Sequence, residues 1–343
     1  MIFPARPKAL FGPLFFLAAL LLAAPASAQD QLKGKTVRLV VGTPAGGGYD
    51  TYGRLVARHL GAHLPGRPTV IVVNMPGASG MNAVSWLYSQ APKDGTVIAT
   101  FNKSQPFYQA IGQQGVHFKT EELSWIASLS QAPDLISVWH TAEARTIEDA
   151  QQKQIVMGAD AGGTMTLYPA LLNATLGTKF KIVTGYGGSA AVYHAIEIGE
   201  VQGVGSTPWT SWKATRPHWV RDKQIVPLVQ IGLKKEPDLP DVPRLVDLAR
   251  NDEQKMLFSF VSAPAAIERP FAAPPGLPAE LLNTYRRAFT DMVKDARFQE
   301  ELARLNLDLD LQPGEDVAKI VSGIVGTPSA IVAKVKTITD EGR

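Results

Sequence analysis

Short runs of β-branched and other apolar residues alternate along most of the chain with longer segments in which apolar residues recur every three or four positions. The short runs are typical of buried strands, and the longer segments of helices with one apolar face. The pattern predicts strands at residues 37–41, 70–73, 97–100, 136–138, 155–158, 181–184, 201–204 and 225–231. This alternation indicates βαβ units and largely parallel sheets.

Helices are predicted between these strands and again in the last third of the chain. Residues 51–64 place apolar side chains at helical spacing from Tyr52 to Leu60, and the pattern ends at Pro65. Two more helices follow a Pro-rich stretch, and the first of them places Leu281, Tyr285, Ala288, Phe289 and Met292 on one face. The sequence contains no long linker, so we expect two domains joined by short crossings, with a hinged cleft between them.

The N-terminus has the three parts of an export signal. Arg6 and Lys8 precede an uncharged apolar run at residues 9–24, and Ala26-Ser27-Ala28 follows as a small-x-small cleavage site. This order predicts a secretory signal peptide at residues 1–28 and a mature chain that begins near Gln29. No later run reaches the roughly 18 uninterrupted apolar residues of a spanning helix, so we expect a soluble exported protein.

Composition narrows the function classes. Removal of Arg6 and Lys8 leaves 32 basic against 31 acidic residues, and this balance gives no basic surface for nucleic acid. The chain has no Cys, which excludes a disulfide framework, a thiol nucleophile and Cys-ligated metal. An export signal without disulfides suits a bacterial periplasm, and about 315 mature residues favour two domains.

Four Gly-rich turns follow predicted strands. They read "TPAGGGYD" from Thr43, "NMPGASG" from Asn74, "ADAGGT" from Ala159 and "GYGGS" from Gly185. Glycine lets the backbone adopt positive φ and approach a ligand, and strand-to-helix turns of open α/β sheets present N–H groups to anions. Two such turns in each half indicate two anion-binding lips that face each other. The alternative is that the glycines only make tight connections.

The turns match no phosphate motif. A dinucleotide fingerprint fails because Thr51 stands where its last glycine is expected, and no Lys-Ser/Thr pair follows the first turn as in a P-loop. A carboxylate, which needs fewer donors and no metal, fits better.

Candidate catalytic and metal residues each have a structural alternative. His59 and His63 have the spacing of two metal ligands, but no third ligand is near, and the end of the first helix explains them better. Asp50 and Asp160 are either an acid/base pair or helix caps. The aromatic residues Trp209, Trp212, Trp219, Tyr49 and Tyr186 either wall an aromatic ligand or pack in the core. The sequence has no Gly-x-Ser-x-Gly nucleophile elbow.

Six stretches, in order over nearly the whole mature chain, carry a family resemblance. They are "RLVVGTPAGGGYDTYGRLVARHL", "VNMPGASG", "APKDGTVIAT", "GYGGSAAVYHAIEIGEVQG", "LPDVPRLVDLA" and "FAAPPGLPAELLNTYRRAF". The chain resembles the extracytoplasmic solute receptors of tripartite tricarboxylate transporters, the Bug/TctC family. The resemblance implies an α/β, two-lobed (type II, flytrap) periplasmic binding protein with mixed, largely parallel sheets flanked by helices. Lobe 1 would comprise residues 29–133 and 255–343, and lobe 2 residues 134–254.

The resemblance also implies which loops bind the ligand. In lobe 1 they would be Thr43, Pro44, Ala45, Gly46, Gly47, Gly48, Tyr49 and Asp50, together with Pro76, Gly77, Ala78, Ser79 and Gly80. In lobe 2 they would be Asp160, Ala161, Gly162, Gly163 and Thr164, then Gly187 and Gly188, and finally Ser206 and Thr207. The chain departs from the family pattern at residues 73–75, near Gly205 and at Tyr49, where a small residue is frequent.

We therefore expect a periplasmic receptor that captures a small organic carboxylate and delivers it to membrane permease subunits. It would be a monomer without cofactor, metal, nucleic-acid partner or enzymatic activity. Two alternatives stay open: a sensory subunit that presents its ligand to a membrane protein, and an exported hydrolase that uses Asp50 and Asp160 in the same cleft.

Overall fold

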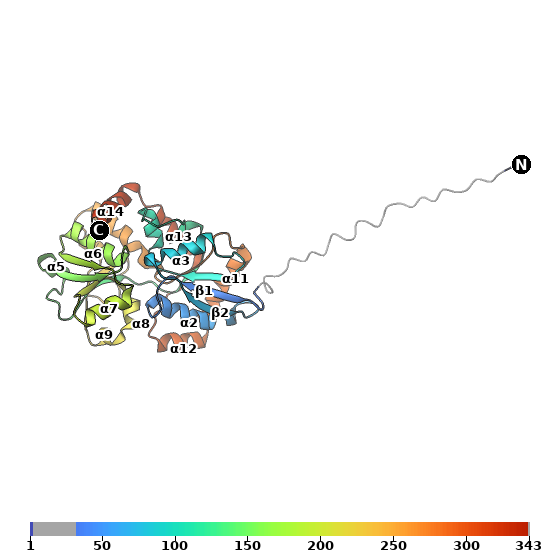
Figure 1. Cartoon of the computed structure of the whole chain (residues 1–343), viewed down its shortest axis with the longest axis horizontal. Helices are drawn as coiled ribbons and strands as arrows, with labels where there is room; N and C mark the ends of the chain where they lie inside the picture. The colour runs from blue at the N-terminus through green and yellow to red at the C-terminus, as the bar shows by residue number, and fades with distance from the viewer. Residues whose placement is uncertain (3–31, 342–343) are drawn as a thin grey trace.

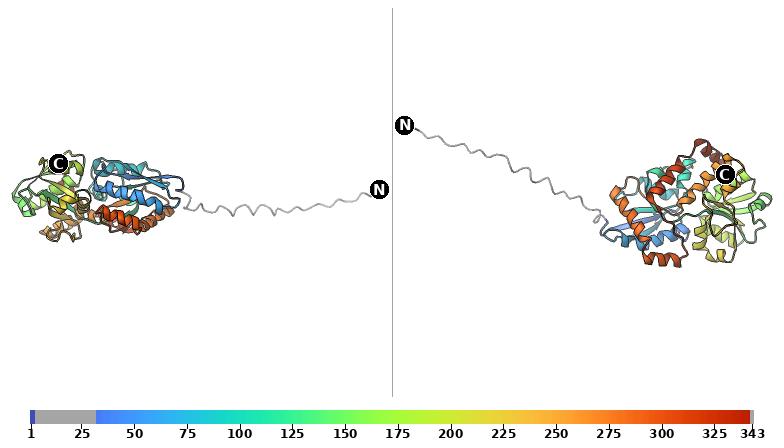
Figure 2. Two further views of the ribbon diagram at one scale, coloured as in Figure 1. Left: turned by 90° about the horizontal axis from the view of Figure 1, so that it is seen from below. Right: turned by 180° about the vertical axis from the view of Figure 1, so that it is seen from behind.

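The apolar runs of the sequence form two separate sheets in the computed structural model, which describes residues 1–2 and 32–341. Figure 1 shows the two sheets side by side, one with green and yellow elements and the other with mainly blue, cyan and orange ones. The views of Figure 2 show the same separation. Apart from its first two residues, the predicted signal peptide lies outside the described residues.

The first sheet has six strands in the order β11-β4-β10-β3-β1-β2. They are β1 (Thr36–Val41), β2 (Thr69–Asn74), β3 (Val97–Thr100), β4 (Ser124–Ser128), β10 (Pro270–Ala273) and β11 (Gln312–Pro313). Strand β1 pairs parallel with β2 and β3, whereas β10 runs antiparallel to β3 and β4. The parallel part therefore lies at one side of the sheet, and its strands end at a common edge.

The second sheet has five strands in the order β7-β6-β8-β5-β9. They are β5 (Asp134–Trp139), β6 (Ile155–Ala159), β7 (Phe180–Thr184), β8 (Gly203–Pro208) and β9 (Ile225–Ile231). Strand β6 is parallel to β7 and β8, and β5 is antiparallel to β8 and β9. We call each sheet with the helices packed on it a half: the first half holds the six-stranded sheet and the second half the five-stranded sheet.

The helices occupy most of the segments between strands. They are α2 (Gly48–His63), α3 (Met81–Ser89), α4 (Gln105–Ala110), α5 (Ile147–Gln152), α6 (Thr164–Leu176), α7 (Ser189–Glu197), α8 (Trp209–Thr215), α9 (Pro217–Arg221), α10 (Asp252–Ser262), α11 (Ala279–Met292), α12 (Ala296–Arg304), α13 (Gly314–Val325) and α14 (Ser329–Glu341). The predicted face of α11 is confirmed, because its five apolar residues are all buried. Short 3-10 turns complete the chain at Ala78–Gly80, Thr120–Glu122, Leu245–Leu248 and Ala263–Ile267.

All eight predicted strands exist, although β8 begins two residues later than predicted and continues to Pro208. Strands β4, β10 and β11 were not predicted. Their sequences SWIAS, PFAA and QP are short and rich in Ser, Ala and Pro, which have little preference for strands. Strands β4 and β10 form because each pairs with a neighbouring strand on both sides, and β11 forms at the edge of the sheet by pairing with β4.

The chain passes between the sheets twice, first from β4 to β5 and then from β9 to β10. The final helix α14 contacts α6 and α10, and Figure 1 shows α14 beside α6. The residue boundaries of the two lobes remain a prediction. Among the described residues no single helix is long and apolar enough to cross a bilayer; α13 and α14 meet that test only as a pair, across a 76° bend.

Three tryptophans form part of the core of the second half. Trp209, Trp212 and Trp219 are all buried, and the rings of Trp212 and Trp219 lie 5.6 Å apart between centroids. Trp219 also contacts Trp139, at 4.7 Å. Packing therefore explains the three tryptophans that the sequence offered as a ligand wall.

The substitution Trp219→Leu should lower the free energy of unfolding by about 2–4 kcal/mol, because it leaves a cavity among large side chains. The control Trp86→Leu changes a tryptophan that is only half-buried, so its effect should be about 1 kcal/mol or less. Urea unfolding followed by circular dichroism measures both. Equal losses in the two variants would contradict the core role of Trp219.

Candidate functional site

A cavity of about 530 Å³ lies between the two halves. Of the predicted ligand residues, those that line it are Thr43, Pro44, Ala45, Gly47, Gly48, Tyr49, Pro76, Gly77, Ala78, Ser79, Gly80, Asp160, Ala161, Thr164, Gly187, Gly188, Ser206 and Thr207. The remaining four, Gly46, Asp50, Gly162 and Gly163, are not part of its lining. Turns that are up to 164 residues apart in sequence are thus brought to one cleft, and their role in binding stays a prediction.

Four of the described helices that begin at this cavity have a glycine as their N-cap. The N-caps are Gly47 of α2, Gly80 of α3, Gly163 of α6 and Gly188 of α7, and none makes a side-chain capping hydrogen bond. The first N–H groups of a helix have no partner within the helix, and its N-terminus carries partial positive charge. Two N-termini from each half therefore present donors and positive potential to the same space.

The glycines at two of these positions have a structural reason. Gly188 has φ +140°, a conformation that L side chains rarely adopt. At Gly48, an added Cβ would lie 2.4 Å from the Ser211 hydroxyl and 2.7 Å from a guanidinium nitrogen of Arg269. The start of α2 can therefore approach α8 of the other half only because residue 48 has no side chain.

Asp50 fixes the first turn and does not reach the cavity. Its carboxylate accepts hydrogen bonds from the Gly46 N–H (2.9 Å), the Asn74 amide (2.9 Å) and the Arg54 guanidinium (2.8 Å). Burial alone would raise the pKa of this carboxyl, but the bonds from Arg54, Gly46 and Asn74 hold the pKa below its usual value. Asp50 is therefore an ionised side chain that stabilises the turn before α2 by hydrogen bonds, and the N-cap of α2 is Gly47.

Asp160 lies in the cavity wall of the second half and meets a residue of the first half. The Ser79 hydroxyl donates to Asp160 Oδ2 at 2.9 Å. Burial raises the pKa of Asp160, and the hydrogen bond from Ser79 opposes this shift. Because Asp50 lies outside the cavity lining, the acid/base pair of Asp50 and Asp160 that the hydrolase alternative requires is not assembled.

Two further contacts join the lips of the cleft. The Gln113 side-chain amide donates to the Gly162 carbonyl at 3.3 Å. A Cβ at Gly188 would lie 3.5 Å from the Pro44 ring, so the two turns are nearly in van der Waals contact. Together with the bond between Ser79 and Asp160, these contacts bring both predicted lips together in this structure.

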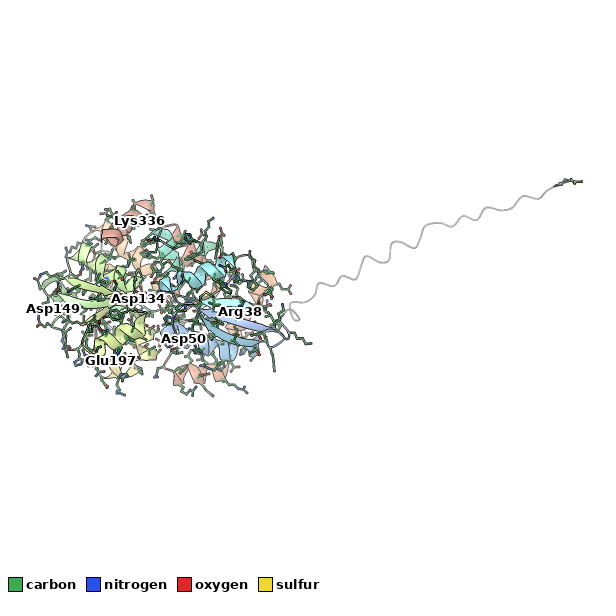
Figure 3. All side chains as sticks on the ribbon, in the orientation of Figure 1. Arg38, Asp50, Asp134, Asp149, Glu197 and Lys336 are labelled. Atoms are coloured by element: carbon green, nitrogen blue, oxygen red, sulfur yellow. The ribbon has the colours of Figure 1, made fainter. Side chains whose placement is uncertain are left out.

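A buried cluster of charges at the floor of the cavity was missed from the sequence. Lys103 Nζ pairs with Asp134 Oδ1 at 3.0 Å and with Glu268, and Arg269 Nη1 lies 2.8 Å from Glu268 Oε1. All four side chains are at most 3% exposed. Asp134 begins β5 and Glu268 precedes β10, so the cluster links the two segments in which the chain crosses between the sheets. Figure 3 labels Asp134 where the two halves meet.

Tyr49 connects this cluster to the cavity. The guanidinium of Arg269 lies over its ring at 4.5 Å and over the Tyr52 ring at 4.9 Å. Arg269 also donates to the hydroxyls of Thr210 (2.9 Å) and Ser211 (2.7 Å) on α8. Burial, and then the negative charge of Glu268, raise the pKa of Tyr49, so its phenol stays neutral. Tyr49 therefore covers a buried cation, and Tyr186 and Tyr193 line the cavity with it.

The two histidines lie at the end of α2, far in sequence from their partners. His59 Nε2 lies 2.7 Å from Glu301 and His63 Nε2 lies 3.4 Å from Asp295. The prediction that they lie along the last turns of the first helix is confirmed. The part of the chain that the structure describes has no group of three or more His, Cys, Asp or Glu residues arranged to hold a metal ion.

Comparison with known proteins extends the resemblance seen in the sequence. No family model matches the chain. The UPF0065 protein in the gbd 5' region of Cupriavidus necator is 26% identical over 328 residues, which cover 92% of this chain and 93% of that protein. The similarity therefore extends over both chains almost from end to end.

Solved solute-binding proteins share the fold. A TctC solute binding protein from Polaromonas superposes with a TM-score of 0.60 at 23% identity, over 89% of this chain and 98% of that chain. A Rhodopseudomonas palustris protein with adipate gives 0.66 at 20% identity, over 88% and 97%. MatC of the same organism, with bound malate, gives 0.64 at 16% identity, over 89% and 98%.

The fold is that of a two-lobed periplasmic binding protein, so the predicted fold class is confirmed. Its sheets are mixed, as predicted, but the described strands make four parallel and five antiparallel pairings, so they are not largely parallel. The predicted resemblance to Bug/TctC receptors is confirmed as well, since its structural relatives include proteins of this kind.

The buried cluster makes a specific prediction for stability. Lys103→Met leaves Asp134 and Glu268 buried without their shared cation, so the free energy of unfolding should fall by about 3–5 kcal/mol. The control Lys319→Met removes an exposed pair with Asp316 on α13 and should cost about 1 kcal/mol or less. Thermal and urea unfolding compare the two, and a similar small effect in both variants would refute the structural role of the cluster.

Proposed function

We propose that this protein is a periplasmic receptor that captures a small organic carboxylate in the cleft between its halves. The observation that carries the proposal is the convergence of four glycine-capped helix N-termini, two from each half, on one cavity. Helix N-termini with free N–H groups bind anions, and a glycine cap leaves those groups to a ligand instead of to its own side chain.

The other groups of the cavity support a carboxylate ligand. The lining combines hydroxyl groups of Ser189, Thr207 and Ser211 with the rings of Tyr49, Tyr186 and Tyr193. Ligand sites of this mixed kind, with few polar groups among apolar ones, orient small organic molecules. Adipate and malate in the two Rhodopseudomonas palustris proteins of similar fold add support for the same ligand class here.

Binding would couple to closure of the cleft. A ligand that binds helix N-termini of both halves makes all its contacts only when the halves lie close together. In this structure they do, since Ser79 contacts Asp160 and Gln113 contacts Gly162. Differential affinity for the closed arrangement is what allows a ligand to favour it. Such a protein needs no catalytic group and no cofactor, since it releases its ligand unchanged.

The remaining parts of the proposal concern location and partners. The predicted signal peptide and the periplasmic binding proteins among the solved structures of similar fold support export to the periplasm. The receptor would act as a monomer that delivers its carboxylate to the permease subunits of a tripartite tricarboxylate-type transporter.

The substitution Gly47→Val tests the site. Gly47 has φ −88°, and the nearest atom to an added Cβ is the Ser189 hydroxyl at 3.7 Å, so the fold should tolerate a side chain there. The isopropyl group would occupy the space in front of the first N–H groups of α2. We expect affinity for carboxylates to fall about a hundredfold or more, with an unfolding midpoint close to that of the parent protein.

Gly323→Val on α13 is the matched control, because an added Cβ at this position has nothing within 4 Å. Thermal-shift and calorimetric titrations with aliphatic mono-, di- and tricarboxylates and aromatic acids measure the outcome for all three proteins. Ligand at about a thousand times its dissociation constant should add roughly 4 kcal/mol to stability. Unchanged binding by the Gly47 variant would exclude the proposed site.

A further inference from the structure

Asp160 is the charged side chain of the cleft that has no charged partner among the described residues. Three residues with formally charged side chains line the cavity: Lys103, Asp134 and Asp160. The first two pair with each other at 3.0 Å. Asp160 Oδ2 accepts one hydrogen bond, from the Ser79 hydroxyl. Its second oxygen, Oδ1, is buried and has no hydrogen-bond partner within the described structure.

The position of Asp160 divides the cavity into two electrostatic regions. Both of its carboxyl oxygens lie 2.6 Å from where a Cβ of Gly163 would be, beside the N-terminus of α6. The positive end of α6 is therefore already compensated by a carboxylate of the protein. The first turn of α2 contains Asp50, and α3 begins one residue after Ser79, the hydrogen-bond partner of Asp160. The first turn of α7 contains no acidic residue, so an anionic ligand group is stabilised best near α7 and is repelled near Asp160.

The orientation of Asp160 is fixed by its own turn. The Asp160 carbonyl accepts a hydrogen bond from the Thr166 hydroxyl at 2.7 Å, within the first turn of α6. The Ser79 hydroxyl holds the carboxylate from the opposite half. The backbone of Asp160 is thus fixed by Thr166 and one carboxylate oxygen by Ser79, while the other carboxylate oxygen can accept a hydrogen bond from a donor that the protein does not supply.

We propose that Asp160 binds a hydrogen-bond donor of the ligand, a hydroxyl or an ammonium group, and so selects hydroxy- or amino-carboxylates over carboxylates that lack such a group. This inference rests on the proposed function and names the ligand class of the same site. A ligand with the donor satisfies the buried Oδ1 atom, whereas a plain carboxylate leaves it unpaired. Sites built around a hydrogen bond discriminate strongly against analogues that cannot form it.

The experiment is calorimetric titration of the exported and purified protein with three matched ligand series. They are succinate, malate and aspartate; glutarate, 2-hydroxyglutarate and glutamate; and phenylacetate, mandelate and phenylglycine, with both enantiomers where they exist. Within a series only the donor changes, and comparison of hydroxyl with ammonium members identifies which donor is used. In at least one series, a donor-bearing member should bind at least tenfold more tightly than the plain one.

Asp160→Asn and Asp160→Ala test the residue. Both variants should reduce the preference for the donor-bearing member about tenfold and should strengthen binding of the plain carboxylate, because a like charge is removed. Loss of structural integrity alone would weaken all members equally, so the gain for plain ligands separates recognition from folding. Glu197→Gln removes the same charge from the exposed end of α7, at the periphery in Figure 3, and should leave every ratio unchanged.

Three results would be decisive against these proposals. If the parent protein binds carboxylates without preference for donor-bearing members in all three series, the role of Asp160 is refuted and the receptor function stands. The same holds if both Asp160 variants keep the preference of the parent. If no carboxylate of any series or of the wider panel binds, the proposed function fails, and the inference about Asp160 fails with it.

Discussion

The buried cluster of Lys103, Asp134, Glu268 and Arg269 is the interaction on which the arrangement of the two halves depends. Buried charges are tolerated only when they are paired, so each of the two chain crossings must keep its acidic residue against the shared cation Lys103. Arg269 extends this constraint to α8 through its bonds to Thr210 and Ser211, and to α2 through the ring of Tyr49. The floor of the cleft is thereby fixed, while the lips above it touch through a few hydrogen bonds.

Glycine N-caps make the helices at the cavity less stable than side-chain caps would, and the binding site gives a reason for them. Ser, Thr, Asn or Asp at an N-cap usually stabilises a helix by about 1 kcal/mol relative to Ala, and glycine provides no side-chain bond. Helix α5, away from the cavity, has such a cap in Thr146, and α10 has one in Asn251. The four glycine-capped helices at the cavity do not. Their N–H groups thus stay open toward the cleft, where side-chain caps would have competed with a ligand.

Sequence patterns predicted the features that depend on neighbouring residues, namely the strands and the Gly-rich turns. The β-branched runs gave all eight expected strands, and the recurrence of Gly-rich turns after strands located most of the cavity lining. Strands β4 and β10 lacked such a pattern because their pairing depends on segments more than 140 residues apart. Lys103 looks like a surface residue in its own segment, and only the fold brings it to Asp134 and Glu268. Of the signals overlooked, the adjacent charges Glu268 and Arg269 within a long apolar stretch were the most informative.

Tyr193 stands between the cavity and the tryptophan core of the second half. It lines the cleft, its ring lies 4.5 Å from Trp212 and 5.8 Å from Trp219, and Arg216 lies over it at 5.3 Å. A molecule that enters the cleft therefore changes the polarity and packing next to two indoles that are themselves shielded from water. Intrinsic tryptophan fluorescence of the second half should therefore change when a ligand occupies the cleft, without any attached dye.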